Sequence, residues 1–190
     1  MSADLTVVLA PGASGTAASM SPYVTGLTAR GFRTAAIDLR RGKAEDAVAG
    51  YLLAARAVDP GAVDPGAADR GSRRLVIGGQ SFGGRVASLL AAEQPVAVQG
   101  VVCFSYPLHR PGAPETWDAR TAHWPRIECP VLLLSGESDP FARIDLLRAA
   151  LVRLPNVELV TYPRVGHGLL SVLPDVLDRV SAFLAALDRG

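Results

Sequence analysis

The chain has 190 residues, of which 49% are hydrophobic and 6% aromatic, and its 19 basic and 18 acidic residues leave a formal net charge of +1. This balance gives no basis for nucleic-acid binding or for attraction to an anionic membrane surface. The apolar stretches are too short for a transmembrane helix, and the length suits one domain over residues 1–190.

The N-terminal residues and the cysteines bear on the compartment. Residues 1–4 carry no basic segment and lead directly into the apolar run Leu5–Ala10, which predicts a strand rather than a signal peptide. Cys103 and Cys129 lie in or just before predicted buried strands, so we expect two free thiols in a cytoplasmic protein. Neither is predicted at a loop tip beside a base, which disfavours a catalytic cysteine.

Predicted strands and helices alternate along the chain. The strands are expected at Leu5–Ala10, Arg33–Leu39, Leu75–Gly79, Val98–Ser105, Val131–Ser135 and Val157–Tyr162. The helices are expected at Pro22–Arg30 (capped by Ser21), Ala44–Ala57, Gly83–Glu93, Ile144–Arg153 and Val172–Leu187. Residues 59–71 should form a surface loop, and residues 107–126 an irregular segment. Apolar strands separated by helices predict an α/β fold, with a mostly parallel sheet of about six strands covered on both faces.

A candidate nucleophile follows the third predicted strand. Residues 79–83 read GQSFG, which is the G-x-S-x-G pattern of a nucleophile elbow with Ser81 at its centre. A strand that turns at once into a helix strains the central residue, and it needs small residues two positions to either side. The alternative is an ordinary glycine-rich turn between a strand and a helix.

A base and an acid are expected at the carboxyl ends of later strands, where sites form in open α/β sheets. His167 follows the last predicted strand and is the best-placed base for the serine hydroxyl. Asp139 follows the fifth strand, and Pro140 restricts it to an extended conformation that fixes how its carboxylate projects. Glu137, in the same loop, is the second candidate for the acid.

Backbone amides are expected to complete the site. The loop after the first strand carries Ala13, and the residue after the nucleophile is Phe82; their N–H groups are the candidate oxyanion hole. The alternative for the first loop is a phosphate-binding glycine loop. It is weaker, because no lysine follows the glycines and no G-x-G-x-x-G pattern is present.

These stretches together resemble the α/β-hydrolase superfamily, and within it the small, lidless, dienelactone-hydrolase-like group that includes testis-expressed relatives. The similar stretches are residues 9–13, 20–23, 77–87, 105–109, 136–141 and 166–167, which read LAPGA, MSPY, IGGQSFGGRVA, SYPLH, GESDPF and GH. The resemblance implies a serine hydrolase with Ser81, Asp139 and His167 as its triad, with no metal and no cofactor. Two departures from the group are Pro11-Gly12 in place of its usual His-Gly, and Phe82 in place of its usual methionine.

The expected partner is a small acyl ester or thioester. No inserted cap domain fits before the fifth strand, so residues 107–126 should form a short rim over an open site. The pocket candidates in and beside this rim are Tyr106, His109, Trp117 and Trp124. The alternative is that these aromatic side chains only pack the loop down. Arg85 and Arg110 are candidates for meeting a substrate carboxylate.

Two other functions stay open at the level of sequence. One is a non-catalytic interaction module that keeps the fold, and the other is a cofactor-free perhydrolase on the same triad.

Overall fold

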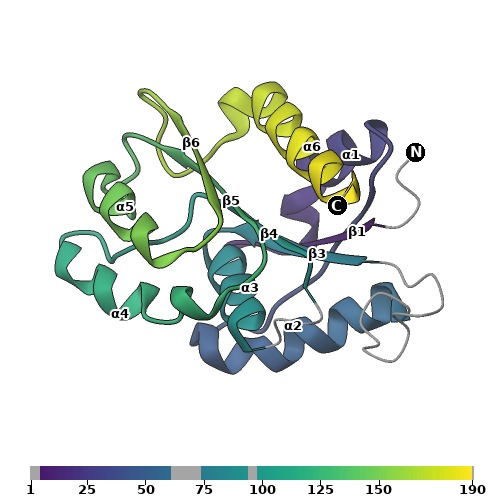
Figure 1. The fold of residues 1–190 in the computed structure, drawn as a ribbon, viewed down its shortest axis with the longest axis horizontal. Coiled ribbons are helices and arrows are strands. Elements are labelled where there is room, and N and C mark those ends of the chain that lie inside the picture. Colours follow the sequence, from purple (N-terminus) through teal and green to yellow (C-terminus); the bar gives the residue numbers. More distant parts are fainter. Residues whose placement is uncertain (1–4, 61–73, 94–97, 190) are drawn as a thin grey trace.

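The computed structural model describes residues 5–60, 74–93 and 98–189. Within them, six strands form one parallel sheet in the order β2-β1-β3-β4-β5-β6 (Figure 1). The strands are β1 Leu5–Ala10, β2 Arg33–Ala36, β3 Arg74–Gln80, β4 Gly100–Phe104, β5 Val131–Gly136 and β6 Val157–Tyr162. The helices are α1 Ser21–Ala29, α2 Ala44–Val58, α3 Phe82–Glu93, α4 Trp117–Thr121, α5 Ile144–Ala150 and α6 Leu173–Arg189. The α/β class and the six-stranded parallel sheet predicted from the sequence are confirmed.

Helices cover both faces of the sheet. Side chains of α2, α3 and α5 pack against one face, and those of α1 and α6 pack against the other (Figure 1). The strands β1, β4 and β5 are buried at every position, which explains why they read as continuous apolar runs instead of alternating ones. Each face of the sheet therefore has its own hydrophobic core.

Three local predictions differ from the structure. Ser21 is the first residue of α1 and not its cap, because a 3₁₀ turn over Ala17–Met20 leads directly into the helix. β2 ends at Ala36 and does not reach Leu39; just beyond it, the Asp38 carboxylate accepts the Ala17 amide at 2.6 Å. The segment 107–126 is not irregular throughout, since it contains α4 and two short 3₁₀ turns. The loop predicted over 59–71 lies, from residue 61 onward, outside the described residues.

The order of the strands fixes where a site forms. The chain adds β2 on one side of β1 and β3 on the other, so the order reverses between β1 and β3. Ala10 and Gly79 pair in register at the carboxyl ends of these two strands. In open α/β sheets the crevice beyond such a reversal is where ligands bind. The loop after β1 and the turn after β3 both open at this point.

Candidate active site

Ser81 occupies a strained turn between β3 and α3. Its φ is +50°, in the left-handed region that non-glycine residues seldom adopt. Two hydrogen bonds hold the turn: the Ser81 amide donates to the carbonyl of Phe104 at 2.9 Å, and the Gly83 amide donates to the carbonyl of Pro11 at 3.0 Å. A Cβ on Gly83 would overlap the carbonyl oxygen of Ala10, so glycine is required where the turn crosses β1. These features are those of the nucleophile elbow that the sequence predicts.

Asp139 and His167 form a hydrogen-bonded pair. His167 Nδ1 lies 2.8 Å from Asp139 Oδ2 and 3.0 Å from Oδ1. The Asp139 side chain is fully buried, whereas that of His167 is 24% exposed. The Phe141 amide donates to Asp139 Oδ1 at 2.8 Å and fixes the direction of the carboxylate. An imidazole held in this way carries its proton on Nδ1, which leaves the Nε2 lone pair free to accept a proton.

Two loops bring this pair together. The amide of Ser138, in the loop after β5, donates to the carbonyl of Val165, in the loop after β6, at 2.9 Å. At Gly136 the backbones approach so closely that a Cβ would overlap the carbonyls of Val165 and Gly166. The ring of Phe141 then packs on His167, with 4.4 Å between the ring centroids. The pairing of residues 28 positions apart therefore depends on backbone contacts as well as on the two side chains.

Glu137 takes a different position from Asp139. Its carboxylate accepts a hydrogen bond from the Thr161 hydroxyl at 2.8 Å and lies 3.6 Å from the guanidinium of Arg148. Of the two carboxylates considered from the sequence, only Asp139 is hydrogen-bonded to the histidine.

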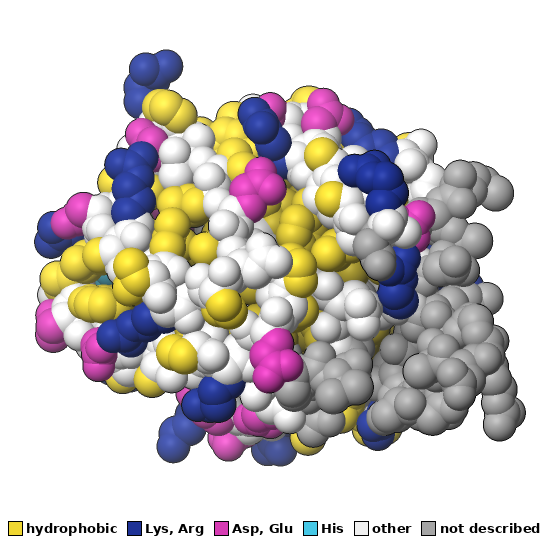
Figure 2. All heavy atoms as spheres, viewed as in Figure 1, with side chains coloured by type: hydrophobic (Ala, Val, Ile, Leu, Met, Phe, Trp, Pro, Cys, Tyr) yellow, Lys and Arg dark blue, Asp and Glu magenta, His cyan; other side chains and the backbone are white. Residues whose placement is uncertain are grey.

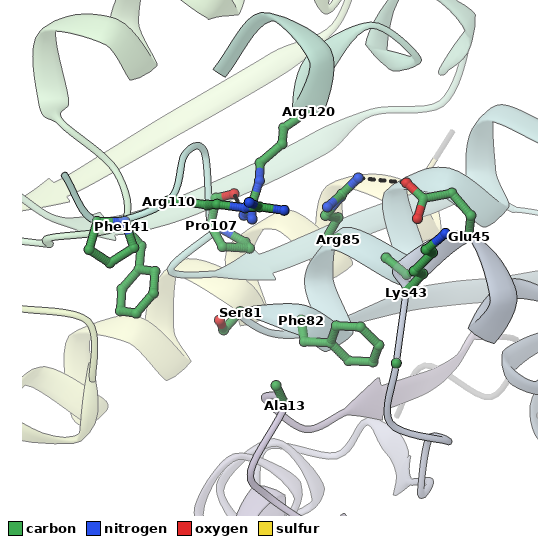
Figure 3. A pocket seen from close by; sticks show the side chains of 13 residues that line it. Ala13, Lys43, Glu45, Ser81, Phe82, Arg85, Pro107, Arg110, Arg120 and Phe141 are labelled. Atoms are coloured by element: carbon green, nitrogen blue, oxygen red, sulfur yellow. Dashed lines mark hydrogen bonds and ion pairs between the residues drawn. The ribbon is translucent and has the colours of Figure 1, made fainter. Parts of the chain in front are cut away.

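The candidate oxyanion-hole residues lie near Ser81 (Figure 3). Ala13, Ser81 and Phe82 line one cavity and lie close together at its lower side in Figure 3. Phe82 is the first residue of α3, so its amide has no partner within the helix. Within the described residues, neither the Phe82 amide nor the Ala13 amide donates a hydrogen bond to another protein group. Both amides are therefore available to an oxyanion.

Ser81 and His167 are not joined directly. No hydrogen bond links the two side chains in the part of the chain that the structure describes. Phe141, which packs on His167, lines the same cavity as Ser81. Hydrogen bonds between nucleophile and base are often long in unliganded enzymes and shorten once substrate is bound.

The cavity beside Ser81 has a volume of about 510 Å³. Its charged lining comes from three parts of the chain: the start of α2, helix α3 and the segment between β4 and β5 (Figure 3). The lining residues are Ala13, Gly42, Lys43, Ala44, Glu45, Ser81, Phe82, Arg85, Pro107, Arg110, Pro111, Arg120 and Phe141. Sequence reasoning named Arg85 and Arg110 but missed Lys43, Glu45 and Arg120, which no motif marks.

The four residues predicted as pocket walls are not among those lining this cavity. Tyr106 and Trp124 are buried against each other in an edge-on pair, with 5.1 Å between ring centroids. His109 is buried too: its Nε2 accepts the Arg143 amide at 3.0 Å, and its Nδ1 lies 2.9 Å from a backbone carbonyl. Trp117 is half-buried under the guanidinium of Arg153, 4.6 Å from its ring centroid. These side chains pack the segment down, as the alternative reading of the sequence proposed.

Among the described residues, the two cysteines are buried and the acidic residues form no cluster of metal ligands. Cys103 and Cys129 are free and buried, and burial raises the pKa of their thiols to about 12 and about 11. Such thiols carry almost no thiolate near neutral pH.

No group of three or more His, Cys, Asp or Glu side chains is arranged to hold a metal ion in the described residues. None of the described helices combines the length and the apolar character that crossing a membrane requires.

The fold is shared with known enzymes. An esterase of Pyrococcus furiosus superposes with a TM-score of 0.78 at 20% identity, over 96% of this chain and 81% of that one. A metagenome-derived lipolytic enzyme gives 0.77 at 16% identity, over 96% and 94% of the two chains. A dienelactone hydrolase of Anabaena variabilis gives 0.74 at 24% identity, over 97% and 87%.

The sequence itself identifies the family. No curated protein matches it significantly. Residues 61–171, more than half of the chain, match the family model of the alpha/beta hydrolase domain, and this stretch contains the elbow, Asp139 and His167. The chain therefore belongs to the α/β-hydrolase family.

Proposed function

We propose that this protein is a serine hydrolase that cleaves small acyl esters or thioesters through a covalent acyl-enzyme. The proposal depends on one observation. The buried Asp139 carboxylate is hydrogen-bonded to His167 Nδ1, near a cavity that is lined by Ser81 in its strained elbow. Structurally similar proteins are named as esterases, lipases and a dienelactone hydrolase, which supports hydrolysis as the class of reaction.

The first half of the reaction forms the acyl-enzyme. Ser81 Oγ attacks the acyl carbon while its proton passes to His167 Nε2, and the carbonyl π electrons move onto oxygen. The amides of Ala13 and Phe82 donate to this oxyanion. When the tetrahedral intermediate collapses, the bond to the leaving group breaks and His167 returns the proton to the leaving oxygen or sulfur.

The second half repeats these steps with water as the nucleophile. His167 takes a proton from water, the hydroxide oxygen bonds to the acyl carbon, and Ser81 Oγ leaves with the proton from His167. Throughout, Asp139 holds the imidazole in one tautomer and stabilises the imidazolium that forms in each half. The small rim over the cavity suits short acyl groups, because no domain is inserted between β4 and β5.

Steady-state hydrolysis tests this proposal. We expect Ser81→Ala to lower kcat/KM for 4-nitrophenyl acetate and a short-chain thioester by about three orders of magnitude or more, because no other group in the site replaces the serine nucleophile. The matched control is Ser181→Ala on α6, whose hydroxyl donates to the carbonyl of Leu177 in its own helix. Wild-type rates in a folded Ser81→Ala preparation would contradict the proposal.

A further inference from the structure

The cavity beside Ser81 carries an excess of positive charge. Four cationic side chains line it (Lys43, Arg85, Arg110 and Arg120), against one carboxylate, that of Glu45, so the surplus is three positive charges. The protein as a whole is near neutral, at +1. On the face of the molecule seen in Figure 2, acidic and basic side chains are interspersed. The cavity is therefore more cationic than the chain as a whole.

Arg85 is the cation closest to the elbow along the chain. It lies one turn into α3, and its amide donates to the carbonyl of Ser81 at 3.0 Å. One end of its guanidinium meets Glu45, with Nη2 2.6 Å from Oε1 (Figure 3). The Nε atom is buried, and none of the described residues accepts a hydrogen bond from it. A buried charged donor without a partner is unfavourable, so this atom is available to donate to an acceptor on a bound ligand.

Arg110 and Arg120 bring two more cations to the same cavity. In Figure 3 their side chains extend from the segment above the cavity toward the space beside Arg85. Arg120 is anchored there, since its Nη1 donates to the carbonyl of Pro107 at 2.8 Å. Burial, followed by the charges of Arg85 and Arg110, lowers the pKa of Arg120. Like charges held together in this way repel one another unless an anion lies between them.

We propose that this arginine cluster (Arg85, Arg110 and Arg120) binds a carboxylate of the substrate, so that the preferred ester carries a negative charge near its scissile bond. The inference rests on the proposed function and names the substrate class of that same site. A guanidinium presents its N–H groups in a plane that matches a carboxylate. Ser81 and Arg85 both line this cavity, and about 6 Å of helical rise separates their backbones, so one small ester can meet both side chains.

Paired substrates test the inference and locate the charge. Monoethyl succinate and the neutral ethyl pentanoate differ by a carboxylate in the acyl part, and 4-acetoxybenzoate and 4-methylphenyl acetate differ by one in the leaving group. We expect the wild-type protein to favour the charged member of one pair. The charged-to-neutral ratio of kcat/KM should fall about tenfold or more in Arg85→Gln, because a hydrogen-bonded charge pair is lost. Comparing this ratio between variants cancels the intrinsic reactivity of each ester.

Two further variants make the result specific. Arg110→Gln alters an exposed side chain and should lower the same ratio without disturbing the fold. Arg179→Gln is the matched control: Arg179 lies on α6 and pairs with Asp175, and its substitution should leave the ratio and the rates unchanged. A wild-type preference for the neutral ester in both pairs, or an unchanged ratio in Arg85→Gln and Arg110→Gln, would overturn the inference.

Binding without turnover separates this inference from the proposed function. Succinate should raise the melting temperature of the wild-type protein and of Ser81→Ala, and should raise that of Arg85→Gln less. If the protein hydrolyses no ester but succinate still stabilises it through Arg85, the carboxylate site stands and the hydrolase proposal fails. If esters are hydrolysed through Ser81 but neither charge nor succinate has an effect, the hydrolase stands and the carboxylate site is refuted.

Discussion

Asp139 and Glu137 lie two residues apart in one loop, yet their surroundings differ. Asp139 is buried on His167, whereas Glu137 is partly exposed between Thr161 and Arg148. An acid that orients a catalytic imidazole must keep the imidazole proton on Nδ1. An amide in place of the acid would favour the wrong tautomer, in which that proton is on Nε2. Replacing each carboxylate by its amide should therefore affect hydrolysis differently at the two positions.

We expect Asp139→Asn to lower kcat/KM for 4-nitrophenyl acetate by roughly a factor of 10³ to 10⁴, while Glu137→Gln keeps most of the activity. Stopped assays at neutral pH measure both variants, with circular dichroism as the check on folding. A larger loss in Glu137→Gln than in Asp139→Asn would reverse the assignment of the acid.

A second histidine affects stability rather than catalysis. His123 is buried, and its Nε2 donates to the Ser88 hydroxyl at 2.8 Å, because that hydroxyl already donates to the carbonyl of Arg85. Burial, together with the charges of Arg85 and Arg126, lowers the pKa of His123 from its usual 6.5 to about 4. The folded protein therefore keeps this imidazole neutral at pH values where the unfolded chain protonates it.

The sign of the pH effect follows from this shift. Between pH 6.5 and about 4 the unfolded state binds more protons at this site, so the free energy of unfolding falls as the pH falls, by at most about 1.4 kcal/mol per pH unit. His123→Gln should make the decline shallower across this window. Urea titrations from pH 7.5 to 4 measure the free energy of unfolding of both proteins. Parallel plots of this free energy against pH would contradict the prediction.

At the scale of elements, the turn from β3 to α3 depends on close packing against β1. A Cβ at Gly83 would overlap the carbonyl of Ala10 and come within 2.8 Å of that of Pro11. In contrast, a Cβ at Gly50, on the exposed side of α2, would meet no atom within 4 Å. The same substitution thus has opposite consequences in two helices.

We expect Gly83→Ala to lower the free energy of unfolding by roughly 1–3 kcal/mol and to impair hydrolysis, because the elbow must shift away from β1. Gly50→Ala, the matched control, should raise it by about 0.5–1 kcal/mol, since alanine favours a helix interior. Chemical denaturation measures both. A Gly83→Ala protein as stable and as active as the wild type would show that the turn is not tightly packed.

Elements were predictable where one sequence signal governed them. β1 and β6 have the predicted bounds because each is a short stretch rich in strand-forming residues between clear loop residues. Within residues 107–126, short helical turns form around buried aromatic side chains, and no periodic pattern marks turns of three to five residues. Tyr106 and Trp124, expected at the pocket, are buried against each other instead of lining the cavity beside Ser81. Sequence shows that an aromatic residue is near a site but not which way it faces.

At the scale of the whole molecule, the parallel sheet brings distant residues together. Ser81, Asp139 and His167 were predicted from sequence because each follows a strand, and parallel strands end at one edge. The arginine cluster was only partly found. Arg120 enters the cavity from α4 through its contact with Pro107, and Glu45 enters from α2 through its pair with Arg85. Such contacts depend on how helices and loops pack, which strand order alone does not determine.

The central claim is that Ser81 is an activated nucleophile, and covalent labelling tests it most directly. Intact mass would be measured after a fluorophosphonate probe reacts with the wild-type protein and with Ser81→Ala. We expect one adduct on the wild type and none on the variant. A folded wild-type protein that forms no adduct, or a variant that is labelled as readily, would contradict the claim; the first result would favour a non-catalytic module that keeps the hydrolase fold.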